Sequence, residues 1–224
     1  MSLIKTAQDT WHATVTRLNA AGTFLPQLFL RLIIFWEFWE AGKLKYDEGA
    51  EGNWFASIQE SFPFPFDVID PSLSWFMAMW GEMLFAILIL FGLFTRFAAV
   101  SLIILTAVAT AAVHWPENWN SLSQLWEGYA ISNDGAGNYK LPLLYIIMLL
   151  PLLFSGAGKF SLDNILAKII NYTDSDAQQS DLGMWGLALL TIGAPLLFLI
   201  PYLGIGLAIA GLAALLLNKV MTPQ

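Results

Sequence analysis

The sequence predicts an all-α membrane protein: a four-helix transmembrane bundle followed by a C-terminal transmembrane helical hairpin, about six spans in total. The first observation is composition, since 57% of the 224 residues are hydrophobic before the 17 glycines are counted. Soluble domains contain about 45 to 50% apolar residues with glycine included. The second is that only 12% of the residues are charged, against roughly 25% in a typical globular protein. The third is the recurrence of apolar runs close to the 20 or so residues that a helix needs to cross a bilayer.

Residues 1–23 form the first predicted unit, an amphipathic segment at the membrane surface. Their apolar side chains recur at helical spacing, and Lys5 and Arg17 lie beside that stripe. Apolar residues on one helix face and basic residues next to them are typical of a helix that lies in the interface plane. A poorly ordered terminus is the alternative interpretation. The stripe consists of Leu3, Ile4, Ala7, Trp11, Val15 and Leu18.

Residues 24–166 form the predicted membrane domain, with four apolar segments of nearly spanning length. The spans are expected at about 24–44, 74–93, 97–113 and 141–154. Residues 167–181 are polar and are expected to form a cytoplasmic linker.

Residues 182–224 form the last predicted unit, a helical hairpin. The apolar run 182–217 would make a helix of about 54 Å, nearly twice the thickness of the bilayer core. It is therefore expected to be two helices that turn near residues 201–204, with Pro195 kinking the first. A single tilted helix is the alternative.

Six spans place both termini on one side, and the basic residues predict which. The terminal segments and the loops on their side contain six Lys and Arg residues (Lys5, Arg17, Arg96, Lys159, Lys168, Lys219), and the opposite loops contain three (Lys43, Lys45, Lys140). The positive-inside rule then predicts cytoplasmic termini in a bacterial inner membrane. The loop at 45–73 is expected to face outward and to cover the outer mouth of the bundle as a lid, because its aromatic residues favour the headgroup level. Plain aromatic anchoring is the alternative.

Ionisable residues within the apolar segments are the candidate functional groups, because each costs about 2.5 to 3.5 kcal/mol at the centre of a bilayer. Helical rise places Glu37 and Glu82 near the midplane, and Glu40 and His114 in the outer leaflet. Arg31 is within reach of Glu82, so an ion pair that fixes helix packing is one interpretation. The other is a polar pocket between the first two spans, with Glu37 and Glu82 as proton carriers or ligand-binding groups. The candidate set is Arg31, Glu37, Glu40, Glu82, His114, Trp36 and Trp39.

Several chemistries are not supported. The chain has no cysteine, which excludes disulfides and thiol redox chemistry. The net charge of −7 argues against nucleic-acid binding. The spacing of the acidic residues and His114 matches no metal signature. No resident cofactor is evident, apart from the quinone considered below.

Three segments carry a family resemblance: RLIIFWEFWEAGKLK in the first span, GEMLFAILILFGLFTRFAA from 81 to 99, and GAGKFSLDNIL from 156 to 166. In this order they resemble the DoxX family of small bacterial membrane proteins, over roughly residues 26–166. The resemblance implies a four-helix bundle in the inner membrane. It also implies that Arg31, Glu82 and Arg96 occupy the family's polar positions, and that Arg96, Lys159 and Asp163 are structural motif residues.

The resemblance leaves function open, because DoxX relatives include a membrane subunit of a thiosulfate:quinone oxidoreductase, partners in redox-stress complexes, and proteins that accompany copper-associated secreted peptides. The first hypothesis is a membrane component of an oxidoreductase system. It would hold a quinone flanked by the aromatic run that includes Trp36 and Trp39, with redox-enzyme subunits as partners. The second is a non-enzymatic factor that handles or exports a small metal-associated peptide. The third is a scaffold for a soluble enzyme. Contact with the lipid bilayer is expected in every case, and self-association into a homo-oligomer is compatible with the sequence.

Overall fold

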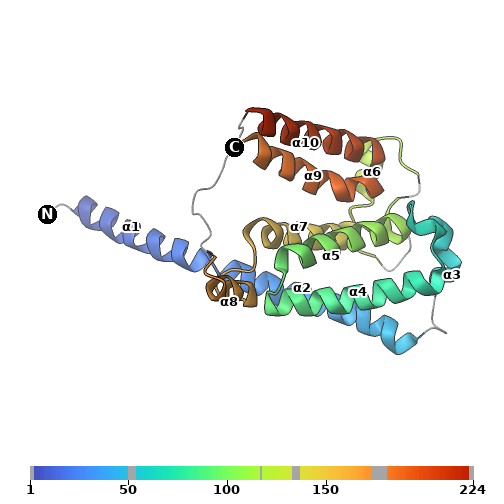
Figure 1. The fold of residues 1–224 in the computed structure, drawn as a ribbon, viewed down its shortest axis with the longest axis horizontal. Coiled ribbons are helices and arrows are strands. Elements are labelled where there is room, and N and C mark those ends of the chain that lie inside the picture. Colours follow the sequence, from blue (N-terminus) through green and yellow to red (C-terminus); the bar gives the residue numbers. More distant parts are fainter. Residues whose placement is uncertain (1–2, 50–53, 117, 133–136, 173–180, 222–224) are drawn as a thin grey trace.

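The computed structural model describes residues 3–49, 54–116, 118–132, 137–172 and 181–221, and all regular structure among them is helical. Four helices form the central bundle: α2 (Leu25–Glu48), α4 (Pro71–Phe91), α5 (Thr95–Ala109) and α7 (Lys140–Ser155). Helix α2 packs on α4, α4 on α5, α5 on α7, and α7 on α2 (Figure 1). This closed ring of contacts is the predicted four-helix bundle.

The bundle core consists of small and branched apolar residues from all four helices. Its fully buried members are Ile34, Ala86, Ile89, Ala98, Ala99, Leu102, Ala107, Leu149 and Leu152. Outward-facing positions on the same helices are large and apolar as well, among them Phe29, Phe76, Leu84 and Phe97. Apolar side chains on both faces of a helix are typical of a membrane span.

Five helical segments of the described chain are long and apolar enough to cross a membrane, judged by length and composition. They are Leu3–Glu48, Pro71–Phe91, Thr95–His114, Leu182–Leu199 and Pro201–Met221. Helix α7 is apolar but shorter. Together with α7 they agree with the predicted count of about six spans.

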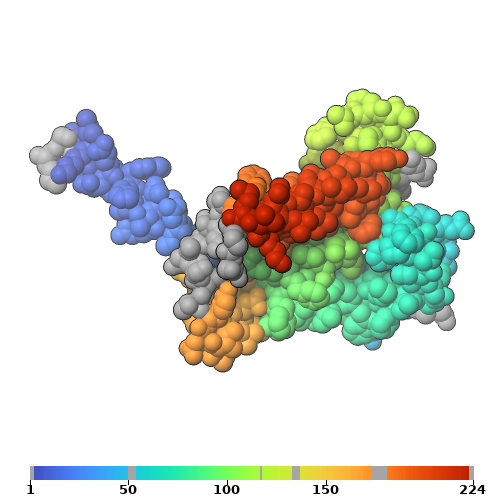
Figure 2. Space-filling view, turned by 45° about the horizontal axis from the view of Figure 1, so that its top comes forward, coloured from blue at the N-terminus to red at the C-terminus, as the bar shows by residue number. Residues whose placement is uncertain are grey.

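The predicted C-terminal hairpin is present as α9 (Leu182–Leu199) and α10 (Pro201–Met221), which separate at Ile200. Glycine allows their close approach, since a Cβ atom at Gly204 would collide with the Leu197 backbone nitrogen. Helix α9 packs on α5, so the hairpin lies against one side of the bundle (Figures 1 and 2).

The N-terminal segment forms helix α1 (Leu3–Gly22), which touches the bundle almost solely through α2 and stands away from it in both views (Figures 1 and 2). Its apolar residues are exposed, including Trp11 at 70%. The predicted segment is therefore helical, and its location at the membrane surface stays a prediction. Residues 173–180 of the predicted linker lie outside the described part of the chain.

The described part of the loop between α2 and α4, residues 54–70, contains three short helical turns: α3 (Phe55–Ile58), η2 (Gln59–Ser61) and η3 (Phe66–Val68). Residues 54–69, which contain these turns, are called the lid below. Helix α4 begins directly after them, because the Asp70 carboxylate accepts hydrogen bonds from the backbone of Ser72 and Leu73 and Pro71 occupies the first turn. The remaining elements are η4 (Thr110–His114), a π-helical turn, and the short helices α6 (Leu122–Glu127) and α8 (Leu162–Ile169).

Candidate functional site: a lidded pocket at one end of the bundle

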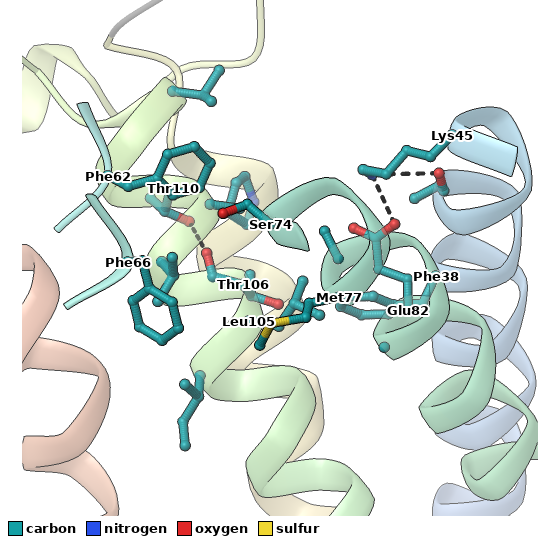
Figure 3. Close-up of a pocket in the computed structure, with 18 of the residues that line it drawn as sticks. Phe38, Lys45, Phe62, Phe66, Ser74, Met77, Glu82, Leu105, Thr106 and Thr110 are labelled. Atoms are coloured by element: carbon teal, nitrogen blue, oxygen red, sulfur yellow. Dashed lines mark hydrogen bonds and ion pairs between the residues drawn. The ribbon is translucent and has the colours of Figure 1, made fainter. Parts of the chain in front are cut away.

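A cavity of about 650 Å³ lies where the four bundle helices meet the lid (Figure 3). It occupies one end of the bundle, formed by the C-terminal parts of α2 and α5 and the N-terminal parts of α4 and α7. This volume falls within the range of about 300 to 1,000 Å³ that is usual for small-molecule sites. The lining is mostly apolar. Its polar members are Glu37, Lys45, Ser74, Glu82, Ser101, Thr106, Thr110, His114 and Tyr145.

The lid is held together by the Gln59 side chain and packs on this end of the bundle. The Gln59 amide nitrogen donates to the carbonyls of Phe66 and Ile69 at 2.7 and 2.8 Å, and to the Ser74 hydroxyl at 3.3 Å. Phe55 is buried against Trp75 at a ring-centre distance of 5.2 Å. Trp54, Phe55, Phe62 and Phe66 of the lid all line the cavity. The expected covering of the bundle mouth is therefore present, while Phe64 faces away and is exposed.

Glu82, one of the predicted site residues, is buried in an ion pair with Lys45. The Lys45 ammonium donates to a Glu82 carboxylate oxygen at 2.7 Å, and the two side chains are 14% and 8% exposed. Figure 3 shows both groups on the wall of the cavity, with Lys45 reaching across from α2 to α4. The predicted pairing of Glu82 with Arg31 is wrong, because Arg31 lies one and a half helical turns nearer the other end of the bundle than Glu37. Helix α2 instead continues past residue 44 and brings Lys45 within reach.

Glu37 also lines the cavity, and its partner is the Tyr145 hydroxyl of α7, which donates to its carboxylate. His114 lines the cavity from the π-helical turn at the end of α5, a type of turn that is common at functional sites. The Asn138 amide oxygen lies 2.6 Å from Nδ1 of His114. Because the Asn138 amide nitrogen donates to the Ser132 carbonyl, this assignment of the amide makes Nδ1 of His114 the donor to Asn138.

Four predicted site residues lie outside the cavity lining: Arg31, Trp36, Trp39 and Glu40. Glu40 and Trp36 are exposed, Trp36 at 60%. Trp39 stacks on Phe35 at 5.9 Å and packs against the core. Of the aromatic run, Phe38 alone lines the cavity, and the other aromatic walls come from Phe85, Tyr145 and the lid. The cavity is also wider than expected, since it borders α5 and α7 as well as the first two spans.

Arg31 lies at the other end of the bundle, in a cluster that holds backbone groups. It is 3% exposed, and its guanidinium donates to the carbonyls of Ile89, Leu90, Ala157 and Phe160. This position needs Gly92, whose φ is +62° and where a Cβ atom would lie 2.9 Å from the Arg31 guanidinium carbon.

Two of the three predicted structural residues join the same cluster. The Asp163 carboxylate accepts from the backbone of Phe94 and Thr95 at 2.7 and 2.9 Å, so it caps the start of α5. Arg96 donates to the carbonyls of Leu153 and Phe154 at the end of α7. Lys159 contributes its carbonyl, which accepts from the Asn164 amide at 2.8 Å. Arg31, Arg96 and Asp163 with these backbone partners are called the closed end below.

Among the described residues, no three His, Asp or Glu side chains come together in a way that could hold a metal ion. Sequence reasoning missed Lys45 and Tyr145. Lys45 could have been predicted from the sequence, because Glu37, Ala41 and Lys45 follow each other at i, i+4 and i+8 on one helix face. No pattern in the sequence around Tyr145 indicates that it belongs to the site.

Comparison with known proteins identifies the family. The DoxX family profile matches residues 27–115. A relative from Haemophilus influenzae, described as an uncharacterized protein, is 40% identical over 153 residues, which is 68% of this chain and 91% of the relative. The chain belongs to the DoxX family. No solved structure gives a significant match.

The part matched to DoxX contains nearly the whole site. Residues 27–115 include every residue that lines the cavity except Pro142 and Tyr145 of α7. Arg31 and Arg96 of the closed end fall within the match as well. The α9–α10 hairpin lies outside it.

Proposed function

We propose that this DoxX protein binds a quinone-type ligand in the lidded pocket and serves as the membrane component of an oxidoreductase system. The observation that carries the proposal is the combination of a cavity of about 650 Å³ with aromatic walls and a few hydrogen-bonding groups that converge on it. Apolar, preformed pockets with a small number of polar groups are the usual form of small-molecule sites.

The chemistry of the lining suits a flat, neutral head with carbonyl oxygens. Phe38, Phe62 and Phe66 supply apolar ring surfaces, and aromatic rings pack well on one another in stacked or edge-on geometry. Lys45 supplies an N–H group that a quinone carbonyl accepts, because Glu82 and Ala41 take two of its three N–H groups. The single hydroxyl hydrogen of Tyr145 is donated to Glu37. Both carboxylates of the pocket already accept a hydrogen bond, from Lys45 and from Tyr145, so the lining favours a neutral ligand over a free cation.

Reduction of a quinone to a quinol takes up two electrons and two protons, and the pocket offers groups for the protons. Tyr145 and Glu37 form a hydrogen-bonded pair between α7 and α2, and His114 lies on the α5 side. These groups are positioned to pass protons by general acid–base exchange. The electrons come from a partner subunit in this proposal. The pocket opens on the outer side of a bacterial inner membrane, with both termini in the cytoplasm.

A matched pair of variants on one helix tests the proposal. Bound quinone is extracted from purified protein in lipid nanodiscs. The amount of quinone per protein is then measured by mass spectrometry for wild type, Glu37→Gln and Glu40→Gln. Glu37 lines the pocket and Glu40 faces outward one turn away. We expect wild type and Glu40→Gln to retain quinone equally, and Glu37→Gln to retain about fivefold less, because the variant loses the charged acceptor that orients the Tyr145 hydroxyl in the pocket wall, a bond of about 1 kcal/mol or more. Equal retention by all three, or a secreted peptide in place of quinone, would contradict the proposal.

A further inference from the structure

The cavity differs in polarity between its two parts. Glu37 and Lys45 of α2, Glu82 of α4 and Tyr145 of α7 form the ion pair and the hydrogen-bonded pair. Between α4 and α5 the polar lining residues Ser74, Thr106, Thr110 and His114 lie toward the lid, and beyond them the cavity continues toward the middle of the bundle between apolar or small side chains. This extension, lined by Met77, Ala78, Gly81, Phe85, Ser101, Ile104 and Leu105, is called the arm below.

The arm runs parallel to the helices. Its lining extends from Met77 to Phe85 on α4, which is about 12 Å of helix at 1.5 Å per residue. The two helices run in opposite directions, so the arm leads from the lid toward the closed end. At the end of the arm farthest from the lid, the ring of Phe85 contacts the outward-facing ring of Phe97 edge to face at a centre distance of 5.7 Å.

Small residues keep the arm open, and its few hydroxyls are already bonded. A Cβ atom at Gly81 would lie 3.2 Å from a methyl carbon of Leu105, so any larger residue there would project into this space. The Ser101 hydroxyl donates to the Phe97 carbonyl at 3.0 Å. The arm therefore offers apolar contact and no unmet hydrogen bond. Met77 at its side is 47% exposed, which places the arm next to the lipid-facing surface.

We infer that the arm holds the apolar tail of the ligand, with the polar head under the lid and the tail directed toward the centre of the bilayer. The inference rests on the proposed function and specifies its ligand as an amphiphile with a long hydrocarbon tail that enters from the lipid phase. The polar groups of the pocket and the apolar arm then contact different parts of one molecule. Figure 3 shows the two regions, with Lys45 and Glu82 on one wall and Met77 and Leu105 beside the arm.

Binding of two probes to the full-length protein in nanodiscs tests this inference. The probes are a dimethoxy-methyl-benzoquinone with a decyl tail and the same benzoquinone without the tail. Ser101→Leu fills the arm from α5, and Gly81→Leu fills it from α4. Val100→Leu is the matched control, since Val100 adjoins Ser101 and faces outward, away from the cavity lining. Comparing each probe with itself across variants removes the effect of its partition into the bilayer.

We expect Ser101→Leu and Gly81→Leu to weaken binding of the tailed probe roughly fivefold or more, because overfilling a packed site is costly. The same variants should change binding of the tail-less probe less than about twofold. Val100→Leu should change neither. Equal effects on the binding of both probes overturn the inference while leaving the quinone site in place. No effect on the binding of either probe does the same, and this is the result expected if a lipid acyl chain fills the arm. Failure of both probes to bind wild type overturns the proposed function and this inference together.

Discussion

The two ends of the bundle use their buried charges in different ways. At the closed end, Arg31 and Asp163 bond to backbone carbonyls and N–H groups of three chain segments. At the pocket end, Glu37 and Glu82 bond to other side chains, Tyr145 and Lys45, around a cavity. Backbone partners cannot move away without breaking the fold, whereas side-chain partners can rotate to meet a ligand. The difference separates charges that build the bundle from charges that are available for binding.

Replacing Arg31 is expected to have the largest effect on stability. Arg31→Leu removes a charged donor from four carbonyls that are buried or part-buried, and each bond to a charged donor contributes about 1.5 to 3 kcal/mol. We expect the free energy of unfolding, measured by denaturing-detergent titration, to fall by about 4 kcal/mol or more. Arg17→Leu is the control, because Arg17 is exposed on α1 and bonds to one carbonyl of its own helix. Similar losses in the two variants would remove the distinction between the ends.

Breaking the Lys45–Glu82 ion pair is expected to have the second-largest effect on stability. Lys45→Met leaves a buried carboxylate without its counter-ion and should cost about 3 kcal/mol of unfolding free energy. The double variant with Glu82→Met should recover most of that loss, since an apolar pair of similar size often replaces a buried ion pair without cost. The double-mutant cycle is completed by Glu82→Met alone. A double variant as unstable as Lys45→Met would show that the pair is needed for folding rather than for binding.

Asp163→Asn is expected to have an intermediate effect. The amide keeps one acceptor oxygen but loses the charge and the second acceptor that cap α5 at Phe94 and Thr95. A loss of about 1 to 2 kcal/mol follows from the strength of helix caps. The control is Asp47→Asn, which removes a carboxylate from an exposed pair with Lys43. Unchanged stability of Asp163→Asn would argue that the closed end does not depend on this carboxylate.

The smallest effect is expected at the contact between the lid and the hairpin. The rings of Phe66 and Phe198 lie 6.0 Å apart, and an aromatic pair contributes about 0.5 to 1.5 kcal/mol beyond its buried area. Phe198→Leu should therefore raise the dissociation rate of a bound quinone about threefold, with little change in unfolding. Leu187→Ala, on an exposed position of the same helix, is the control. A dissociation rate that does not respond to Phe198 would show that the hairpin does not hold the lid.

The fold was largely predictable because it follows from the length and spacing of apolar runs. The lid was predictable from its aromatic residues, and the hairpin from a run too long for one span. Partners of single charges were harder to predict. Arg31 bonds to carbonyls, which every residue carries, so no sequence pattern distinguishes them from an acidic partner such as Glu82.

Helix ends and rotation account for the remaining errors in the site. The first span was predicted to end at about residue 44, which placed Lys45 in a loop. Helix α2 instead continues to Glu48, and one face of it carries Glu37, Ala41 and Lys45 together. Glu40 lies three residues from Glu37, but the rotation of α2 in the bundle turns it outward. That rotation depends on packing against α4 and α7, which the sequence of α2 alone does not contain.

Photolabelling with an azido-benzoquinone that carries a decyl tail tests the central claim most directly. The labelled residues are mapped by peptide mass spectrometry, with the tail-less benzoquinone as competitor. The account predicts labels on the lid and on the pocket-facing residues of α4 and α5, removed by the competitor, and none at the closed end. Labels scattered over the lipid-facing surfaces of α9 and α10, or unaffected by the competitor, would contradict it.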